Sequence, residues 1–404
     1  MSASRPFSGP APASHARADQ RVGRLGRDRS ALRDSSSRRD SSPRRDASSR
    51  RDASPRLDAR VQRALLGLLA ASALAFLQAC GHVGPSATGD ASAASKSKSA
   101  TVFEIAMIPD TQNYVDYTHQ RAEGFVFDAS HLLMEQMRWI ASRTVNEGGK
   151  VAFVAAVGDV WQHQSLPIDP AHAARGMKAV RNPFFAGHFD PTPKVREIEI
   201  PKALEAYQVL ADSEVPFGVA PGNHDYDAMW TTDQFPPNPK KPPQQIRMVP
   251  EDIGMLHVGG LDNFRSAFGD DKPFFQGKSW YVASFRGGAN SAQVFRAGGY
   301  EFLHFALEMQ ADDEVVAWVG SVLAKYPGRP TILSTHDYLD PRGQRRANPI
   351  IDLDRVDPDH HNSAEELFRK LIAKNDQIFL VLCGHQHGQG FRVDENEQGH
   401  EVYQ

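Results

Sequence analysis

Cysteine is scarce in this chain, since the 404 residues include only Cys80 and Cys383. Two cysteines cannot build the disulfide framework on which small secreted domains depend. Cys383 follows a run of apolar residues, which predicts a small buried thiol. Long apolar runs are also missing: the stretch Ala64–Leu77 has 14 residues, whereas a helix that spans a bilayer needs about 20.

A large excess of one charge is also absent, because the formal net charge is only −3. This balance hides an asymmetry. Residues 1–60 contain 15 Arg and 7 Asp, while the remaining chain has 31 Lys and Arg against 42 Asp and Glu. An acidic body disfavours broad electrostatic binding to nucleic acid, so we expect no nucleic-acid partner for it.

The first 60 residues have low complexity and contain a hexad repeat, RRDSSP (38–43), RRDASS (44–49) and RRDASP (50–55). With few apolar groups to bury, residues 1–60 are expected to be disordered. One interpretation is a basic arm that binds nucleic acid or anionic lipid. The interpretation that we favour is a solvated extension or a start codon assigned too early.

Residues 61–80 have the features of an export signal. Arg60 and Arg63 precede the apolar stretch, whose length suits a signal-peptide core. The stretch ends in LQAC, which resembles the lipobox of bacterial lipoproteins, although Gln78 is unusual at its position. This resemblance implies a lipid on Cys80 and an exported protein anchored in the bacterial cell envelope, periplasmic or at the outer membrane. The alternative is an ordinary buried helix.

Residues 81–100 are rich in Gly, Ser and Ala, as is typical of a flexible tether. From residue 101 onward, apolar runs alternate with segments of helical periodicity, which predicts an α/β domain over residues 101–404. Strands are expected within residues 101–108, 151–157, 215–220, 280–285, 300–309, 330–336 and 377–383, with 280–285 and 300–309 antiparallel. Helices are expected at residues 131–145, 201–213, 314–326 and 363–375.

Most of these core strands end in polar residues of the kind that bind metals. The endings contain Asp110 and Gln112, Asp159, Asn223 with His224 and Asp225, His336, and His385 with His387. In open α/β sheets, ligands bind at the carboxyl ends of strands. Carboxylate, amide and imidazole groups together suit hard to borderline metals. Each ending by itself is also consistent with a helix cap or a turn.

Together and in this order, the endings DTQ, GD, GNHD, TH and GHQH resemble the sequence blocks of the calcineurin-like metallophosphoesterase superfamily. The resemblance covers residues 101–404 and implies a four-layer α/β/β/α sandwich that holds two metal ions (Mn, Fe, Zn or Mg). It assigns Asp159 as the ligand that bridges both metals. It places Asp110, Gln112 and His387 on the first metal, and Asn223, His336 and His385 on the second.

The same resemblance implies hydrolysis of a phosphomonoester or phosphodiester by a hydroxide bound to the dinuclear metal centre. It assigns His224 to the substrate phosphate, where this residue protonates the leaving group or stabilises developing charge. Asp225 is expected to orient the ring of His224. The alternatives are a phosphodiesterase specific for nucleotides or phospholipid headgroups, and a metal-binding envelope lipoprotein without turnover.

Gln112 departs from the family pattern, which has His at this position. A neutral amide oxygen is a weaker ligand for zinc than imidazole, so the first site is expected to prefer harder ions. The sequence DTQNY also resembles a branch of exported bacterial members of the superfamily. The alternative is that Gln112 only donates a hydrogen bond beside a single metal.

Other parts of residues 101–404 carry no motif. Residues 162–199 and 226–278 are rich in Pro, Gly and Lys, which predicts lids or mobile insertions that determine specificity. The family usually continues with more strands after GHxH, so a domain truncated at its C-terminus and an exposed sheet edge are expected. Six histidines without a motif are expected to be exposed: His163, His172, His188, His257, His360 and His361.

Overall fold

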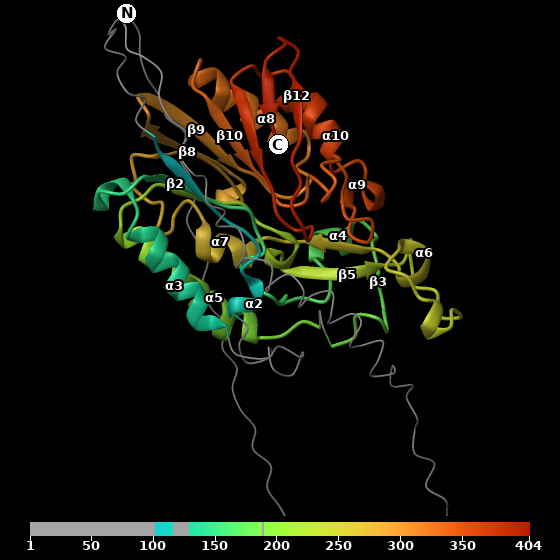
Figure 1. The fold of residues 1–404 in the computed structure, drawn as a ribbon. Coiled ribbons are helices and arrows are strands. Elements are labelled where there is room, and N and C mark those ends of the chain that lie inside the picture. Colours follow the sequence, from blue (N-terminus) through green and yellow to red (C-terminus); the bar gives the residue numbers. More distant parts are fainter. Residues whose placement is uncertain (1–101, 116–128, 188–189) are drawn as a thin grey trace, which may run out of the picture. The chain divides into compact units, whose positions relative to one another are not determined.

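The computed structural model describes residues 102–115, 129–187 and 190–404 (Figure 1). The arginine repeats, the signal-type segment with Cys80, the tether and His188 lie outside the described residues. Within the described part of the chain, no helix has both the length and the apolar character needed to cross a membrane. The α/β class predicted from the sequence is confirmed for this part.

Three sheets are present in the described residues. The first has the parallel order β1-β2-β4, the second the mixed order β12-β13-β11-β10-β9-β8-β7, and the third the antiparallel order β3-β5-β6. The strands are β1 (Glu104–Ile108), β2 (Val151–Ala156), β3 (Ala179–Val180), β4 (Phe217–Val219), β5 (Ala228–Thr232), β6 (Leu256–Gly259), β7 (Tyr281–Phe285), β8 (Asn290–Ala297), β9 (Tyr300–Ala306), β10 (Thr331–Ser334), β11 (Ile378–Leu382), β12 (Val393–Glu395) and β13 (Glu401–Tyr403).

The helices predicted from periodicity are present, with shifted ends. The α-helices are α2 (Gln112–Val115), α3 (Ser130–Ala141), α4 (Pro170–Ala174), α5 (Ile200–Asp212), α6 (Pro250–Ile253), α7 (Asp262–Phe268), α8 (Asp313–Lys325), α9 (Leu353–Val356) and α10 (Ala364–Leu367). The helix predicted at 363–375 begins with a capping box between Ser363 and Glu366, as its sequence indicates. It then continues as the π-helical turn Phe368–Ile372.

Strand β2 explains how the first two sheets pack. All six of its residues are buried, as its continuous apolar run predicts. Val154 and Ala156 belong to the hydrophobic cluster that includes residues of α3 and α5, whereas Phe153 belongs to a cluster between the two sheets. The ring of Phe153 stacks on that of Phe295 in β8, with 4.6 Å between the ring centroids.

A third hydrophobic cluster covers the other face of the seven-stranded sheet. It joins residues of β9, β10 and β11 to Val319 and Leu323 of α8 and to Leu367 of α10. Figure 1 shows α3 and α5 on one side of the two sheets and α8 and α10 on the other. The carboxyl ends of β1, β2, β4, β10 and β11 can therefore meet across the interface between the sheets.

The segments 280–285 and 300–309 are strands, as predicted. They form β7 and β9, and each pairs antiparallel with β8, which lies between them. Strand β8 was missed because its sequence, NSAQVFRA, begins with residues that are common in turns.

The segments 162–199 and 226–278, which were predicted as lids or mobile insertions, contain regular secondary structure. These segments contain α4, α6 and α7 and the whole third sheet. Strands β5 and β6 are short and buried along their full length, so they lack the alternation that identifies a strand in a sequence.

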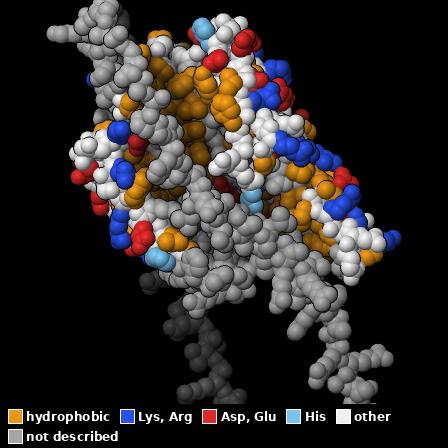
Figure 2. Space-filling model, viewed as in Figure 1, with side chains coloured by type: hydrophobic (Ala, Val, Ile, Leu, Met, Phe, Trp, Pro, Cys, Tyr) orange, Lys and Arg blue, Asp and Glu red, His pale blue; other side chains and the backbone are white. Residues whose placement is uncertain are grey.

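The residues that follow the GHQH segment form the hairpin of β12 and β13, and β13 pairs with β11. Half-buried hydrophobic side chains of β1 and β11, including Ile105 and Leu380, pack against the cluster between the sheets. Figure 2 shows hydrophobic side chains gathered over the strands on this face. Cys383, just after β11, is half-buried, and burial raises the pKa of its thiol to about 11.

Candidate metal centre

Residues predicted as metal ligands lie just beyond the carboxyl ends of strands from both large sheets. The parallel strands of each sheet direct these ends to one edge, and the packing of the two sheets brings the edges together. The positions are Asp110 after β1, Asp159 after β2, Asn223 after β4, His336 after β10 and His385 after β11.

Three side chains converge on Nε2 of His336. Oδ1 of Asn223 lies 3.0 Å from it, Oδ1 of Asp159 lies 3.2 Å from it, and Nδ1 of His385 lies 3.2 Å from it. Nδ1 of His336 donates to the main-chain carbonyl of Val157 at 2.8 Å, so Nε2 is the nitrogen that faces the other groups. Lone pairs gathered this closely require a proton or a metal cation among them.

The electrostatics of the pair Asp159 and His336 favour a cation at this point. Burial by itself would raise the pKa of Asp159, but the neighbouring His336 and His224 hold it well below its usual range. Burial would lower the pKa of His336, but the carboxylates of Asp159 and Asp110 raise it to about 10. Acidic surroundings that hold a proton on an imidazole also suit a metal ion in its place.

Several of these residues have backbone conformations that side chains rarely adopt. Asp110, Asp159 and His385 have φ angles of 49°, 55° and 66°, and such angles cost free energy and concentrate at functional sites. Gly158 has φ 103°, and a Cβ there would lie 2.5 Å from the main-chain nitrogen of Gly222. The position directly before Asp159 therefore has no room for a side chain.

Gln112 and Asp110 approach the centre from β1 and α2. Nε2 of Gln112 donates to Oδ2 of Asp159 at 3.2 Å, which directs its Oε1 elsewhere. Among the described residues, this buried Oε1 has no hydrogen-bond partner. The carboxylate of Asp110 accepts the main-chain N–H of His385 at 3.0 Å, and burial raises its pKa. Asp110 therefore connects the ends of β1 and β11.

The chemistry of the donor set fits metal ions. The groups are carboxylate and amide oxygens and imidazole nitrogens, which bind Mn, Fe and Zn. Both Oε1 of Gln112 and Nε2 of His385 are buried without a hydrogen-bond partner in the described part of the chain. A buried polar atom without a partner is costly, and a cation coordinated by Oε1 of Gln112 would satisfy it. Nε2 of His385 lies on the other side of the ring from the Nδ1 that faces His336, and it is 4.0 Å from the carboxylate of Asp337.

His387 is the exposed member of the predicted ligand set. The atoms of Asp159, His336 and His385 that can hold a metal all lie within 4.8 Å of one another. Asp110 is outside this group, as His387 is, but it accepts the main-chain N–H of His385. In the turn after His385, the side-chain amide of Gln386 donates to Asp337 and to the main-chain carbonyl of Arg346.

His224 lies beside Asp159. Its main-chain N–H donates to Oδ1 of Asp159 at 2.9 Å, and its Nδ1 donates to the carbonyl of Gln162 at 2.6 Å. The predicted role of Asp225 in orienting this ring needs correction. Its carboxylate instead accepts three main-chain N–H groups, from Gly222 at 2.8 Å, Val160 at 2.8 Å and Trp161 at 3.3 Å.

Asp225 thus connects the loop after β4 to the loop after β2. Its side chain is fully buried, and burial together with the nearby charge of Asp159 raises its pKa to about 8. A carboxyl group that accepts main-chain N–H groups from two loops positions these loops, which carry proposed ligands, relative to each other. The sequence signal, an Asp within GNHD, was visible, but its partners were not.

The loop after Asp159 is held by Glu199, a residue that the sequence did not identify as part of the site. Glu199 accepts the main-chain N–H groups of Gln162 and His163 and pairs with Nδ1 of His163 at 2.6 Å. His163 is therefore buried, and the prediction that it is exposed is wrong. Glu199 fixes the loop whose Gln162 carbonyl holds the ring of His224.

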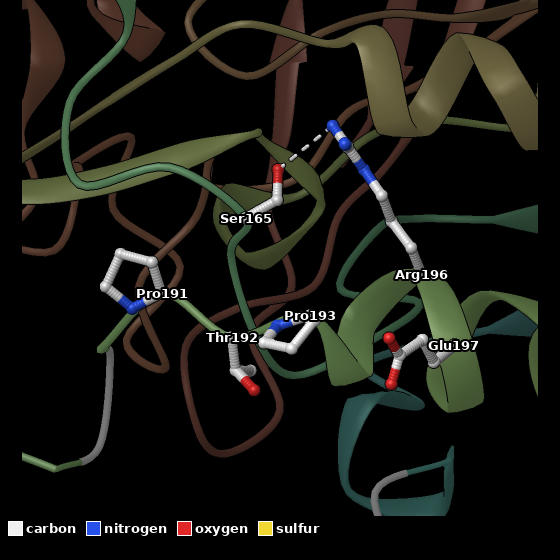
Figure 3. Close-up of a pocket in the computed structure, with 6 residues that line it drawn as sticks. All are labelled: Ser165, Pro191, Thr192, Pro193, Arg196 and Glu197. Carbon is white, nitrogen blue, oxygen red and sulfur yellow. Dashed lines mark hydrogen bonds between the residues drawn. The ribbon is translucent and has the colours of Figure 1, made fainter. Parts of the chain in front are cut away.

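A cavity of about 340 Å³ adjoins this loop (Figure 3). Its lining consists of Ser165, Pro191, Thr192, Pro193, Arg196 and Glu197. Figure 3 shows the Arg196 guanidinium directed at Ser165, to which it donates at 3.3 Å. Gln164 connects the cavity to His224. Its side-chain amide donates to the main-chain carbonyl of His224, and its main-chain carbonyl accepts from the main-chain N–H of Thr192. None of the predicted ligands lines this cavity.

Three further histidines differ from their prediction as exposed loop residues. His257 is fully buried in β6, and His172 and His361 are half-buried. Together with Asp357 they form a second group whose ligand atoms lie within 4.8 Å of one another. Of the five such histidines that the structure describes, His360 alone is exposed as predicted, with 51% of its side chain accessible.

No model of a known protein family matches the chain. The uncharacterized protein YvnB of Bacillus subtilis (strain 168) is 26% identical over 193 residues, which are 48% of this chain and 12% of that protein. The chain therefore spans about an eighth of the length of this relative. The crystal structure of a dimetal phosphatase from Danio rerio aligns with a TM-score of 0.33 and 12% identity, over 75% of this chain and 87% of that chain.

Proposed function

We propose that this chain is a metal-dependent phosphoesterase of the calcineurin-like type, which hydrolyses a phosphomonoester or phosphodiester. The observation that carries the proposal is the convergence of Asp159, Asn223 and His385 on Nε2 of His336. The four residues come from the ends of strands in two different sheets. His224, a further polar group suited to proton transfer, lies directly beside them.

The residues divide between two proposed metal positions. Asn223, His336 and His385 would hold the second ion, and Asp159 would serve both ions. Asp110, Gln112 and His387 would complete the first position, and the unpartnered Oε1 of Gln112 supports this assignment. When bound, the ions supply Lewis acidity toward the phosphate and activate a water for attack.

The protein's own groups would position the ring of His224 and supply the proton to the leaving group. The Gln162 carbonyl accepts from Nδ1 of His224, so we assign Nε2 to the leaving oxygen of the ester. Glu199 holds the Gln162 main chain in place, and Asp225 holds the loop that carries His224. These contacts fix the ring before substrate arrives, which favours catalysis.

The wider architecture and location are also proposed. The two large sheets with α3 and α5 on one side and α8 and α10 on the other match a four-layer α/β/β/α sandwich. The LQAC segment supports a lipid anchor on Cys80 and a position in the bacterial cell envelope. The neutral oxygen of Gln112 favours Mn²⁺, Mg²⁺ or Fe²⁺ over Zn²⁺ at the first position.

A metal-binding envelope lipoprotein without turnover is the alternative, and one observation favours it. His387 is exposed and outside the group of ligand atoms, so the first metal position lacks one of its proposed ligands. A chain with one filled position would bind metal and hydrolyse little.

Turnover by the full-length protein tests the proposal. Metal-stripped protein is supplied separately with Mn²⁺, Zn²⁺, Fe²⁺, Mg²⁺ or Ni²⁺ and assayed on bis-p-nitrophenyl phosphate and p-nitrophenyl phosphate. Metal-dependent turnover that His224→Ala and Asp159→Asn abolish is the expected result, and the better substrate separates diesterase from monoesterase. Bound metal without turnover for any ion favours the lipoprotein alternative instead.

A further inference from the structure

Four side chains far apart in the sequence meet in a second place, away from the strand ends that carry the candidate metal centre. His172 comes from α4, His257 from β6, and Asp357 and His361 from the segment after α9. We call these four residues the histidine cluster. One ligand atom from each lies within 4.8 Å of those of the other three.

Each imidazole of the histidine cluster is held by its Nδ1. His172 donates to the Asp169 carboxylate at 2.6 Å, and His257 donates to the main-chain carbonyl of the next residue at 2.6 Å. His361 donates to the carbonyl of Gln310 at 3.3 Å. Because carbonyl and carboxylate oxygens only accept, Nδ1 carries the proton in each ring and Nε2 carries the lone pair. Histidines that bind metals are oriented by this kind of contact.

The lone pair of His257 lacks a donor. Its ring is fully buried, and among the described residues its Nε2 has no hydrogen-bond partner. Another fully buried histidine, His304, shows the ordinary arrangement. Both of its ring nitrogens are bonded, to Gln293 at 2.7 Å and to Ser334 at 2.8 Å. Burial in the core therefore does not account for the unpartnered nitrogen of His257.

Asp357 completes the cluster with an oxygen 3.9 Å from Nε2 of His257. Arg175 binds this carboxylate with both guanidinium nitrogens, at 2.6 and 3.1 Å. A simple ion pair would explain this contact by itself, but it would leave the three imidazole lone pairs facing one another. Carboxylates that bind metals are themselves hydrogen-bonded, so Arg175 is compatible with either role.

We propose that the histidine cluster is a structural zinc site with three imidazole ligands and one carboxylate. Zinc prefers four nitrogen, sulfur or oxygen ligands in a tetrahedron, and closed sites of this kind have a structural role. Metal–ligand distances of about 2.0–2.1 Å place tetrahedral ligand atoms a little over 3 Å apart. The 3.9 Å between the Asp357 oxygen and Nε2 of His257 would shorten by about 0.5 Å to reach this geometry.

A metal here would join three parts of the chain. Helix α4 precedes the third sheet, β6 belongs to it, and Asp357 and His361 lie in the connection between β10 and β11 of the seven-stranded sheet. The main-chain bond from Leu256 to Ile350 already links the same segments at 2.7 Å. The site would fasten the small sheet to the rest of the domain and increase the stability of the fold.

Zinc content of the full-length protein tests this inference. Wild type, His361→Ala and His257→Phe are purified after growth with zinc, and bound metal is measured by mass spectrometry. The phenylalanine keeps a ring against Trp230, on which His257 stacks with 5.1 Å between ring centroids. We expect each variant to lose one zinc per chain and to melt at a lower temperature. His360→Ala is the matched control, because His360 touches Asp357 but is outside the cluster.

Equal zinc content in wild type and in a folded His361→Ala or His257→Phe variant would overturn the inference. If both variants fail to fold, His385→Ala decides, because it alters the candidate metal centre alone. Loaded with Co²⁺, this variant should retain one ion with the intense absorption of tetrahedral nitrogen and oxygen coordination. Absence of that ion would overturn the inference. Neither result depends on whether the chain hydrolyses phosphate esters.

Discussion

Ligand atoms reach the candidate metal centre from the ends of strands, whereas those of the histidine cluster come from a short helix, a strand of the third sheet and a loop. The candidate metal centre contains strained backbone, oxygen donors and unpartnered atoms of both Gln112 and His385. The histidine cluster has three oriented imidazoles and a carboxylate already held by Arg175. Strain and open coordination are typical of catalysis, while a closed imidazole set is typical of structure. Four predictions test this difference, from the largest expected effect to the smallest.

Asp159→Asn should remove turnover while leaving the histidine cluster intact. Asp159 contacts His336, Gln112 and the main chain of His224, so loss of its charge affects all three contacts. Loss of several kcal/mol of transition-state stabilisation that depends on the metal corresponds to a fall in kcat of about 10³-fold or more. Assays on p-nitrophenyl esters measure this, with the exposed Asp212→Asn as the matched control. Comparable activity in Asp159→Asn and wild type would contradict the assignment.

His224→Ala should lower kcat by about 10²–10⁴-fold without changing the metal content. The ring lies beside Asp159 but is assigned to proton transfer and not to a metal. Kinetics and metal analysis of the same preparation separate the two roles. Loss of a metal ion in this variant would move His224 from proton transfer to coordination.

Arg175→Gln should weaken zinc at the histidine cluster by about 10–100-fold, as expected when a hydrogen-bonded partner of a ligand is removed. The guanidinium orients Asp357 through two hydrogen bonds. Competition with a chromogenic chelator measures the affinity. Phosphoesterase activity at saturating metal should stay unchanged. Unchanged zinc affinity would identify the contact between Arg175 and Asp357 as an ion pair alone.

His304→Gln should change the pH dependence of stability but not the metal content. Burial lowers the pKa of His304 to about 3, whereas an unfolded chain has about 6.5. Between these values only the unfolded chain binds the proton, so stability falls as pH drops, by up to about 1.4 kcal/mol per pH unit. Urea unfolding with EDTA from pH 7 to pH 4 should show a shallower slope in the variant. Identical slopes would assign the acid sensitivity to other groups.

The parts of the fold that the sequence predicted are those with local patterns. The buried strand β2, the helices α3, α5 and α8, and the polar residues after each core strand follow from periodicity and from strand ends. Strands β5, β6 and β8 were missed because short buried strands and turn-like residues carry no such pattern. The role of Asp225 was misassigned because its three main-chain partners lie in two different loops.

The sequence by itself determined which residues stand at strand ends, since an apolar run followed by Asp159 or His336 is a local feature of the chain. Only the tertiary structure decided which of these groups meet, because the distances depend on how the two large sheets pack. It also decided that His172, His257 and His361 face Asp357, although these residues lie in three separate segments of the chain. Contacts between distant segments arise from burial and packing, which no local pattern encodes.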